Sequence, residues 1–323
     1  MSTRRQFALS LAAGALLGPL VDAAAQDDKS PIRLLVGLAA GGSNDVAARI
    51  LADKLKDLLG RPIIVENRLG AGQRLALAEL RHSPPDGRTL ILATNSPFTI
   101  YPHIYAKLDY DPVKDFTPVA GVTRFDIGFA TGPLTGATDL RQWLAWAKAN
   151  PAQTSYGTPG AGTLPHFLGV AFSQALGLNM PMVPYKGGAV ALTDLVGGHL
   201  PLLIDGLSDM IEMHRSGKIH VLAVAGDVRS PLLPDVPTLK ERGIDITSVI
   251  TVGVFGPANM PPDLVRELNA AITKAVKSPE VVERFAHNGL IPAPTSPQEL
   301  AATLAAESKR LGALVKASGY VAE

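Results

Sequence analysis

Ile32-Arg33-Leu34-Leu35-Val36 predicts a buried strand, and the glycine turn Gly41-Gly42-Ser43 that follows it leads into a helix over about 44–59. Ser43 is expected to cap this helix. Ile63-Ile64-Val65 begins the next strand. The same order continues, with helices expected over 72–81, 139–149, 164–175 and 189–196 and strands over 89–93, 200–205 and 221–225. This is the pattern of an open α/β sheet with helices on both faces.

Two helix starts in the C-terminal part have the pattern of a capping box, in which serine or threonine is followed three residues later by glutamate. They are Thr238-Leu239-Lys240-Glu241 and Ser296-Pro297-Gln298-Glu299. A short helix, a strand over 250–255 and three further helices are therefore expected between 237 and about 318.

Length and charge exclude several classes of protein. The 323 residues suffice for one large domain or two smaller ones, and a hydrophobic fraction of 46% fits a packed core. Lys+Arg 30 against Asp+Glu 29 gives a net charge of +1, which predicts no nucleic-acid or anionic-lipid partner. The absence of cysteine excludes disulfides, thiolate metal sites and cysteine nucleophiles.

The first 25 residues have the layout of an export signal. Arg4 and Arg5 precede an apolar run over 9–21, and Ala23-Ala24-Ala25 offers small residues to a signal peptidase, so the mature chain is expected to start near Gln26. The arginine pair resembles a twin-arginine signal, and the alternative is the general secretory route. No later run reaches about 18 apolar residues, so the exported protein is expected to be soluble and periplasmic.

Common catalytic and cofactor-binding motifs are absent from the sequence. It has no Gly-x-x-x-x-Gly-Lys-Ser/Thr, no His-Glu-x-x-His and no Gly-x-Ser-x-Gly. Gly70-Ala71-Gly72 and Gly160-Ala161-Gly162 each begin a dinucleotide-like motif, but Leu75 and Pro165 occupy the position of its third glycine. No metal and no cofactor are therefore expected, and an enzyme is the least favoured class of function.

Two glycine turns carry the strongest chemical signal. Residues 39–45 and 156–164 each place a glycine-rich turn between a predicted strand and a predicted helix. Backbone N–H groups at a helix N-terminus lack an intrahelical partner and attract anions, and glycine lets an anion approach them closely. Two such turns in one α/β chain suggest a two-lobed clamp on an anionic ligand. The alternative is that both are ordinary tight turns.

Short motifs in a fixed order extend over almost the whole chain after the export signal. They include Gly41-Gly42 with Asp45 and Arg49, Val65-Glu66-Asn67-Arg68, Pro85-Asp86-Gly87, Tyr110-Asp111-Pro112, Tyr156-Gly157, Val183-Pro184-Tyr185-Lys186-Gly187, Thr193-Asp194-Leu195, Ser216-Gly217-Lys218 and Pro234-Asp235-Val236-Pro237-Thr238. In this series the chain resembles the Bug family, the extracytoplasmic solute receptors of tripartite tricarboxylate transporters.

The resemblance implies a type II periplasmic-binding-protein fold, with two α/β domains, each an open sheet flanked by helices, joined by two crossing strands. Domain 1 would cover 27–125 plus 248–323, and domain 2 would cover 126–247. A small carboxylate-bearing solute would lie in the cleft between them, held largely by backbone amides of the two glycine turns and by ordered waters. The implied ligand-binding residues are Gly41, Gly42, Ser43, Asp45, Asn95, Ser96, Gly157, Thr158, Gly160, Gly162, Thr163, His166, Tyr185, Lys186 and Asp205. For Tyr185 and Asp205 a core or hinge role is the alternative.

The sequence also departs from the family pattern. Gly37 and Leu38 replace the usual proline and aromatic residue before the first glycine turn, and Gln73-Arg74 replaces the common Gly-Asn. Arg74 at the mouth of an anion cleft would favour a second carboxylate on the solute. The alternative places Arg74 on the solvent face of its helix.

The leading hypothesis is a monomeric receptor that presents a small organic anion to the membrane permease subunits of a tripartite transporter. A receptor that engages the periplasmic domain of a sensor kinase would have the same sequence features. A periplasmic hydrolase or isomerase is a third possibility, which the missing catalytic motifs disfavour.

Overall fold

The computed structural model describes residues 30–185 and 187–322, so the expected export signal and Lys186 lie outside the described part. Strands and helices alternate along most of the chain, as the sequence predicts. The strands are β1 (Ile32–Val36), β2 (Ile63–Asn67), β3 (Thr89–Thr94), β4 (Phe116–Thr131), β5 (Tyr156–Thr158), β6 (Met182–Pro184), β7 (Leu203–Gly206), β8 (His220–Val224), β9 (Val249–Pro257) and β10 (Ile291–Thr295). The helices are α1 (Ser43–Leu59), α2 (Arg74–Arg81), α3 (Ser96–Thr99), α4 (Tyr101–Ile104), α5 (Leu140–Ala149), α6 (Leu164–Leu176), α7 (Gly188–Val196), α8 (Leu207–Arg215), α9 (Pro262–Val276), α10 (Pro279–His287) and α11 (Pro297–Ser318), with 3₁₀ turns η1 (Ala71–Gln73) and η2 (Lys240–Arg242).

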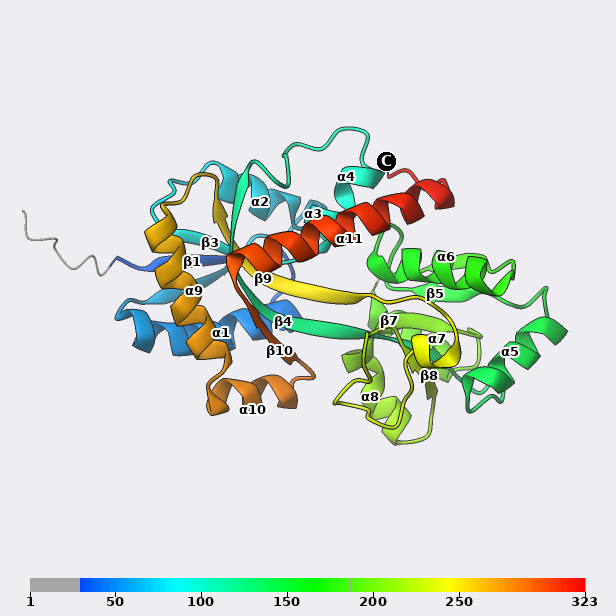
Figure 1. Ribbon diagram of the computed structural model, residues 1–323. Helices are drawn as coiled ribbons and strands as arrows, with labels where there is room; N and C mark the ends of the chain where they lie inside the picture. Colours follow the sequence, from blue (N-terminus) through cyan, green and yellow to red (C-terminus); the bar gives the residue numbers. More distant parts are fainter. Residues whose placement is uncertain (1–29, 186, 323) are drawn as a thin grey trace, which may run out of the picture.

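The strands of the described residues form one continuous sheet in the order β2-β1-β3-β9-β4-β7-β5-β6, with β8 and β10 also paired to β4. Strand β1 lies parallel to β2 and β3, and β5 lies parallel to β6 and β7. Antiparallel pairs join β3 to β9, β9 to β4 and β4 to β7. Figure 1 shows β4 and β9 running between a half that holds β1, β3 and α9 and a half that holds β5, β7 and α5.

Strand β4 is shared by the two halves. Its pairing with β9 ends at Asp126, which lies opposite Val249. From Ile127 onward β4 pairs with β7, where Ile127 lies opposite Gly206, and with β8. The apolar pattern of the sequence predicts neither β4 nor β10. The family resemblance does imply two crossing strands, and β4 and β9 are the strands that cross.

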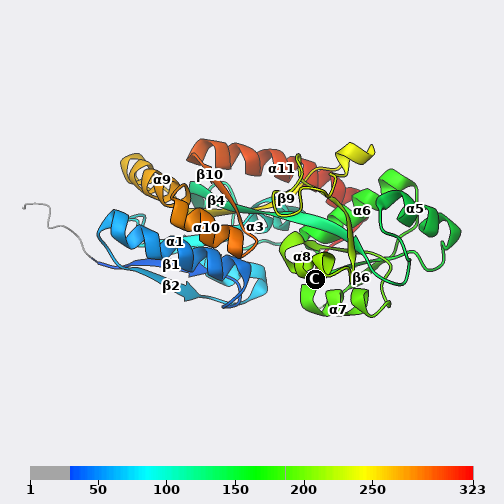
Figure 2. The same cartoon turned by 90° about the horizontal axis from the view of Figure 1, so that it is seen from below.

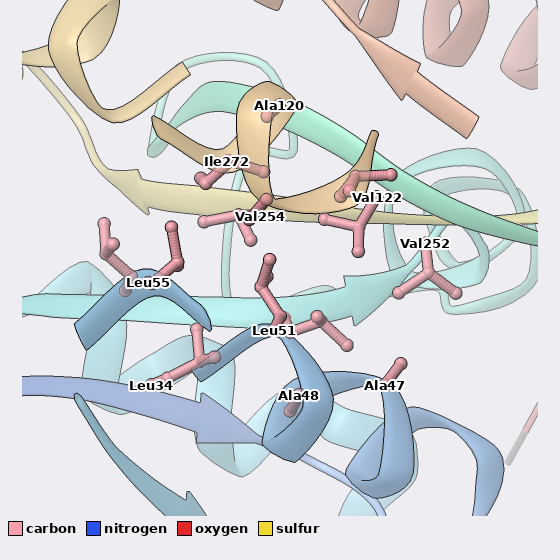
Figure 3. Packing of buried hydrophobic residues seen from close by; sticks show 14 of the residues in the cluster. Leu34, Ala47, Ala48, Leu51, Leu55, Ala120, Val122, Val252, Val254 and Ile272 are labelled. Carbon is pink, nitrogen blue, oxygen red and sulfur yellow. The ribbon is translucent and has the colours of Figure 1, made fainter. Parts of the chain in front are cut away.

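Buried aliphatic side chains fill the space between the sheet and helices α1 and α9 in the first half. Leu34, Leu51, Val122, Val254 and Ile272 belong to this core and point toward one another (Figure 3). They come from β1, α1, β4, β9 and α9, so segments far apart in the sequence meet there. Burial of each large aliphatic side chain contributes about 1.5–3 kcal/mol, which fixes the sheet that carries the first glycine turn.

Helix α11 packs along both halves. Near its start, Leu300 and Leu304 lie in a core with Phe98 and Phe255 of the first half. Near its end, Leu311 and Val315 join the core of the second half. The expected division assigns all of 248–323 to domain 1, whereas the packing of α11 extends past the crossing strands (Figure 1). Within the described residues, no helix is long and apolar enough to cross a membrane.

Helix caps follow the sequence in part. Ser296 and Glu299 form the predicted capping box at the start of α11. Thr238 and Glu241 exchange the same two hydrogen bonds, at 3.0 and 2.9 Å, but no α-helix starts there: only the short turn η2 follows, and its N-cap is Leu239. The prediction that Ser43 caps α1 is wrong. Gly42 is the N-cap and Ser43 is the first helical residue, because the turn closes one residue earlier than the apolar pattern indicates.

Ser296→Ala tests the contribution of the α11 cap. We expect a loss of about 1 kcal/mol in the free energy of unfolding, because the N–H of Glu299 loses its acceptor. Urea unfolding monitored by circular dichroism measures this loss. Gln298→Ala is the control, because Gln298 is exposed in the first turn of the same helix and makes no side-chain hydrogen bond to any described residue. An equal loss in the two variants would contradict the role of the capping box.

Candidate functional site

Loops at the carboxyl ends of parallel strands face the junction between the halves. They follow β1, β2 and β3 in the first half and β5, β6 and β7 in the second. Open α/β sheets bind ligands at this edge. Gly41 and Ser43 of the first edge line a cavity of about 390 Å³ together with Ser208 and Asp209 of the second. Figure 2 shows α1 and α10 next to the junction with α8.

Four helices start at these edges without a side-chain cap from the described residues. They are α1, α6, α7 and α8, with N-caps Gly42, Thr163, Gly187 and Gly206. Their first N–H groups lack an intrahelical acceptor, and the helix dipole adds positive potential there. Helices α9 and α10 also start without such a cap. A missing cap alone therefore does not distinguish the four helices. What distinguishes them is that they all start around the junction.

Asp45 holds the first glycine turn in place. Its Oδ2 accepts hydrogen bonds from the Gly41 N–H and from Arg49 Nε, both at 2.9 Å. Its Oδ1 accepts from Arg49 Nη2 and Asn67 Nδ2. Burial by itself raises the pKa of Asp45, but the hydrogen bonds from Arg49, Gly41 and Asn67 outweigh it and keep the pKa below its usual value. The carboxylate predicted to bind ligand thus has its acceptor capacity used within the protein.

The second glycine turn is held by its own side chains. Gly157 and Thr158 lie in strand β5 itself and not in the turn that follows. Thr158 and Thr163 both donate their hydroxyl hydrogen bonds to the Gly160 carbonyl oxygen, at 3.1 and 2.7 Å. The Gly162 N–H donates to His166 Nδ1 at 3.1 Å. The threonines therefore brace the loop that leads into α6.

His166 is a packing residue of this turn. Its ring stacks on Phe167 and meets Tyr320 edge-on, and it is 6% exposed. Burial lowers the pKa of His166, so the ring is neutral and its Nδ1 can accept from Gly162.

Tyr185 and Asn95 are partly committed to other contacts. The Tyr185 hydroxyl donates to Asp194 at 2.9 Å, and burial together with this carboxylate raises the pKa of Tyr185 to about 12. Asn95 Nδ2 donates to Glu307 of α11 and to the Val249 carbonyl oxygen of β9. Ser96 is the first residue of α3. Asn95 therefore links the end of β3 to a crossing strand and to α11.

Buried polar atoms without a partner gather at the same junction. In the described part of the chain, they are Asn44 Nδ2, Asn95 Oδ1, Asp126 Oδ1 and Oδ2, and Asp205 Oδ2. Asn44 lies in the first turn of α1, Asn95 at the end of β3, Asp205 at the end of β7 and Asp126 at the crossing point of β4. Such atoms are rare in folded proteins, because each costs about 1–3 kcal/mol unless a ligand or water completes its hydrogen bonds.

Asp205 lies beside a second carboxylate. Its Oδ1 accepts from the Gly206 N–H at 2.7 Å. A β-carbon built on Gly188 would lie 2.1 Å from Asp205 Oδ2 and 3.0 Å from Asp209 Oδ2, so the two oxygens face the same small space at the start of α7. Only glycine fits at position 188. Burial, and to a lesser degree the Asp209 charge, raises the pKa of Asp205 to about 7.

Comparison with known proteins decides the family. The family model described as "Tripartite tricarboxylate transporter family receptor", TctC, matches residues 47–320. The chain belongs to this family. BugT of Bordetella pertussis is 32% identical over 291 residues, which cover 90% of the chain and 89% of BugT. These matches confirm the resemblance predicted from the sequence.

The solved structure of the periplasmic binding protein BugD, with 28% identity, a TM-score of 0.76 and 91% of the chain and 99% of that structure covered, confirms the periplasmic-binding-protein fold of this TctC receptor. R. palustris Rpa4515, solved with adipate, has 28% identity and a TM-score of 0.80, with 91% of the chain and 99% of that structure covered. MatC from Rhodopseudomonas palustris, solved with bound malate, has 30% identity and a TM-score of 0.75, with 88% and 99% covered.

Two departures of this TctC receptor from its family pattern form one contact. A β-carbon on Gly37 would lie 2.7 Å from both the Cα and the Cβ of Gln73, so a side chain at 37 would collide with the backbone and the side chain of Gln73. Gln73 is buried with φ 77° and bonds Thr94 through both ends of its amide. The resemblance drawn from the sequence implies proline at the first position and glycine at the second. Here the two are exchanged, and Gln73 anchors η1 to the end of β3.

Arg74 is held within the first half of the receptor. Its Nε donates to the Ala71 carbonyl oxygen at 3.1 Å, and its guanidinium lies 4.2 Å from the centre of the Tyr105 ring. Cation–π stacking of this kind fixes the position of the charge. No contact of Arg74 with the second glycine turn is present among the described residues, so its proposed contact with a solute stays a prediction.

Sequence reasoning missed three polar residues of this site. Asn44 adjoins the first glycine turn and could have been found by its position at the start of α1. Asp126 is an acid inside the otherwise apolar end of β4, which is an unusual place for a charge. Asp209 gives no sequence signal, because its proximity to Asp205 follows from the turn between β7 and α8.

Gly37→Ala tests the exchanged pair. We expect a loss of about 1–3 kcal/mol in the free energy of unfolding, because the new methyl group would collide with the backbone and side chain of Gln73. The double variant with Gln73→Gly should recover only part of the loss, because it removes the Cβ and Cγ contacts while the Cα of residue 73 stays 2.7 Å from the new methyl group. A double-mutant cycle in urea measures the coupling, and additive losses would contradict the contact.

Asp205→Asn tests the buried carboxyl through pH. Between about pH 4 and 7 the folded chain keeps a proton on Asp205 that the unfolded chain has released, so stability falls as pH rises through this window. The variant lacks this loss. Its stability advantage should therefore grow from pH 4.5 to pH 8, by at most about 4 kcal/mol.

Urea unfolding at the two pH values measures the difference. Asp245→Asn removes an exposed carboxyl from the same half and serves as the control, with no such growth expected. A pH-independent difference between Asp205→Asn and the parent would show that this carboxyl ionises normally.

Proposed function

We propose that this TctC receptor captures a small carboxylate-bearing solute between its two halves and presents it to the membrane subunits of a tripartite transporter. The observation that carries the proposal is the meeting of two carboxyl edges, each with uncapped helix N-termini and buried polar atoms that lack partners. Helix N-termini supply N–H donors and positive potential for a carboxylate without any basic side chain.

The ligands of relatives agree with this class of solute. Rpa4515 was solved with adipate and MatC with malate, and both compounds are small dicarboxylates. The sites share the fold, so the backbone donors at the strand ends are available to this chain as well. The main binding groups are expected in the two glycine turns, at Gly41, Gly42, Ser43, Gly160 and Thr163, with Lys186 as a further candidate.

Two halves joined by two crossing strands give the receptor a means of closing, during which the contacts of α11 with the second half would also change. We take 27–125 plus 248–323 as the first half and 126–247 as the second, because the partners of β4 change between Asp126 and Ile127. A solute that contacts both edges favours the closed form only by the contacts that the open form lacks. The closed form would then be recognised by the transporter in the periplasm, after export by the N-terminal signal. A sensor-kinase domain could recognise the same closed form.

Gly42→Val and Gly160→Val test the two turns separately. Gly42 has an extended backbone that valine adopts readily, and a β-carbon there would meet one close contact, the Ala39 carbonyl oxygen at 3.3 Å. A β-carbon on Gly160 would meet only ordinary contacts. Each variant should therefore fold. Each should lose roughly tenfold or more in affinity, because the branched side chain blocks approach to N–H donors whose bonds to a charged group contribute about 1.5–3 kcal/mol.

The measurement is isothermal titration calorimetry with the solute found by mass spectrometry on the purified receptor, or with adipate and malate, alongside thermal melting. Unchanged affinity in both variants would place the binding site away from the glycine turns. A receptor that binds no mono- or dicarboxylate in a thermal-shift screen would overturn the proposed function.

A further inference from the structure

We infer that the solute carries a hydrogen-bond donor, an ammonium or hydroxyl group, close to its carboxylate, and that Asp205 accepts the hydrogen bond from this group. The inference rests on the proposed function and deepens it, since it names α-amino or α-hydroxy acids as the solute class. Both groups present the same chemistry to a carboxylate acceptor, and the experiment below distinguishes them.

Acceptors outnumber donors among the buried polar atoms of the described residues that lack a hydrogen-bond partner. One of them, Asn44 Nδ2, is a donor, while Asn95 Oδ1, both oxygens of Asp126 and Asp205 Oδ2 are acceptors. The amide of Asn95 cannot be reversed to correct this, because its Nδ2 already donates to Glu307 and to the Val249 carbonyl oxygen. A simple carboxylic anion brings only further acceptors. The junction therefore needs donors from whatever it binds.

Asp205 lies at the edge of the second half where the uncapped helices begin. Strands β5 and β7 are parallel neighbours, with Gly157 opposite Leu203, so Asp205 ends the strand next to the one that leads into the second glycine turn. Helices α6, α7 and α8 all begin at this edge. Their N–H groups suit a carboxylate, and the unpartnered Asp205 oxygen beside them suits a donor. An amino or hydroxy acid presents both groups on neighbouring atoms.

The carboxyl groups of Asp205 and Asp209 lie close together at the start of α7. Asp205 is 6% exposed, and its free oxygen faces the same space as Asp209 Oδ2, at the position where any side chain at 188 would stand. Two carboxylates in one place repel each other unless a proton or a donor lies between them. An ammonium or hydroxyl group that donates to Asp205 relieves this repulsion, whereas a second solute carboxylate increases it.

Matched sets of acids test the inference on the intact receptor. The sets are succinate, malate and aspartate; glutarate, 2-hydroxyglutarate and glutamate; and propionate, lactate and alanine. Within each set the carbon chain is constant and the carbon next to a carboxylate bears no donor, a hydroxyl or an ammonium group. Calorimetry at pH 8 should give a donor-bearing member at least roughly tenfold tighter binding than its parent acid in at least one set.

Asp205→Asn should reduce that preference to about threefold or less, because the amide presents a donor in place of the free acceptor oxygen. The exposed control Asp245→Asn should keep the preference of the parent protein. Tighter binding of the hydroxy acid alone identifies a hydroxyl as the donor, and tighter binding of the amino acid alone identifies an ammonium group.

Equal affinity within every set that binds, or a preference that survives in Asp205→Asn, would overturn the inference and leave the capture of small carboxylates intact. Failure of all nine compounds and of every other mono- and dicarboxylate in the thermal-shift screen would instead overturn the proposed function, and the inference with it.

Discussion

The hydrogen bonding of β4 to both halves is the constraint on which the rest of this structure depends. One strand of sixteen residues pairs with β9 and β10 at one end and with β7 and β8 at the other, so the two halves share this strand. The two carboxyl edges are therefore held facing each other. Any rotation between the halves must be taken up near Asp126 in β4 and Val249 in β9, since their pair is the last before the partners change, and in the contacts of α11, which packs on both halves.

The alternating α/β order could be predicted from the sequence because its signals are local. Apolar runs, glycine stops and the Ser296–Glu299 capping box each depend on a few neighbouring residues. Strand β4 could not be predicted in this way, because the signals that specify it are not local. Pro118, Gly121 and Gly128 interrupt its apolar pattern, and the partners that stabilise it lie up to about 170 residues away. Its existence followed only from the resemblance to a family with two crossing strands.

The positions of the glycine turns could be predicted from the sequence, but the contacts of the side chains around them could not. The glycine turns do lie at the edges where the helices begin, because turn chemistry is local. The roles of Asp45, Thr158, Thr163 and His166 could not be assigned in this way. Their side chains point back to the loop backbone and hold its shape, and only the folded chain brings Asn67 to Asp45. The polar atoms left without partners belong mostly to residues that the turn motif does not include.

In a site of this kind, different groups of the protein determine the affinity for a carboxylate and the selectivity among acids. Backbone N–H donors at the helix starts are the same for every sequence that folds into these turns, so they can bind a carboxylate but cannot distinguish one acid from another. Selectivity must come from side chains whose hydrogen-bonding capacity is not used within the protein. In this chain most of those groups are acceptors, with Asp205 and Asp126 as the carboxyl groups among them, and acceptors discriminate strongly because a solute without a donor leaves them unpaired. The exchanged Gly37–Gln73 pair alters the first edge by packing alone, and it leaves this division between backbone donors and side-chain acceptors intact.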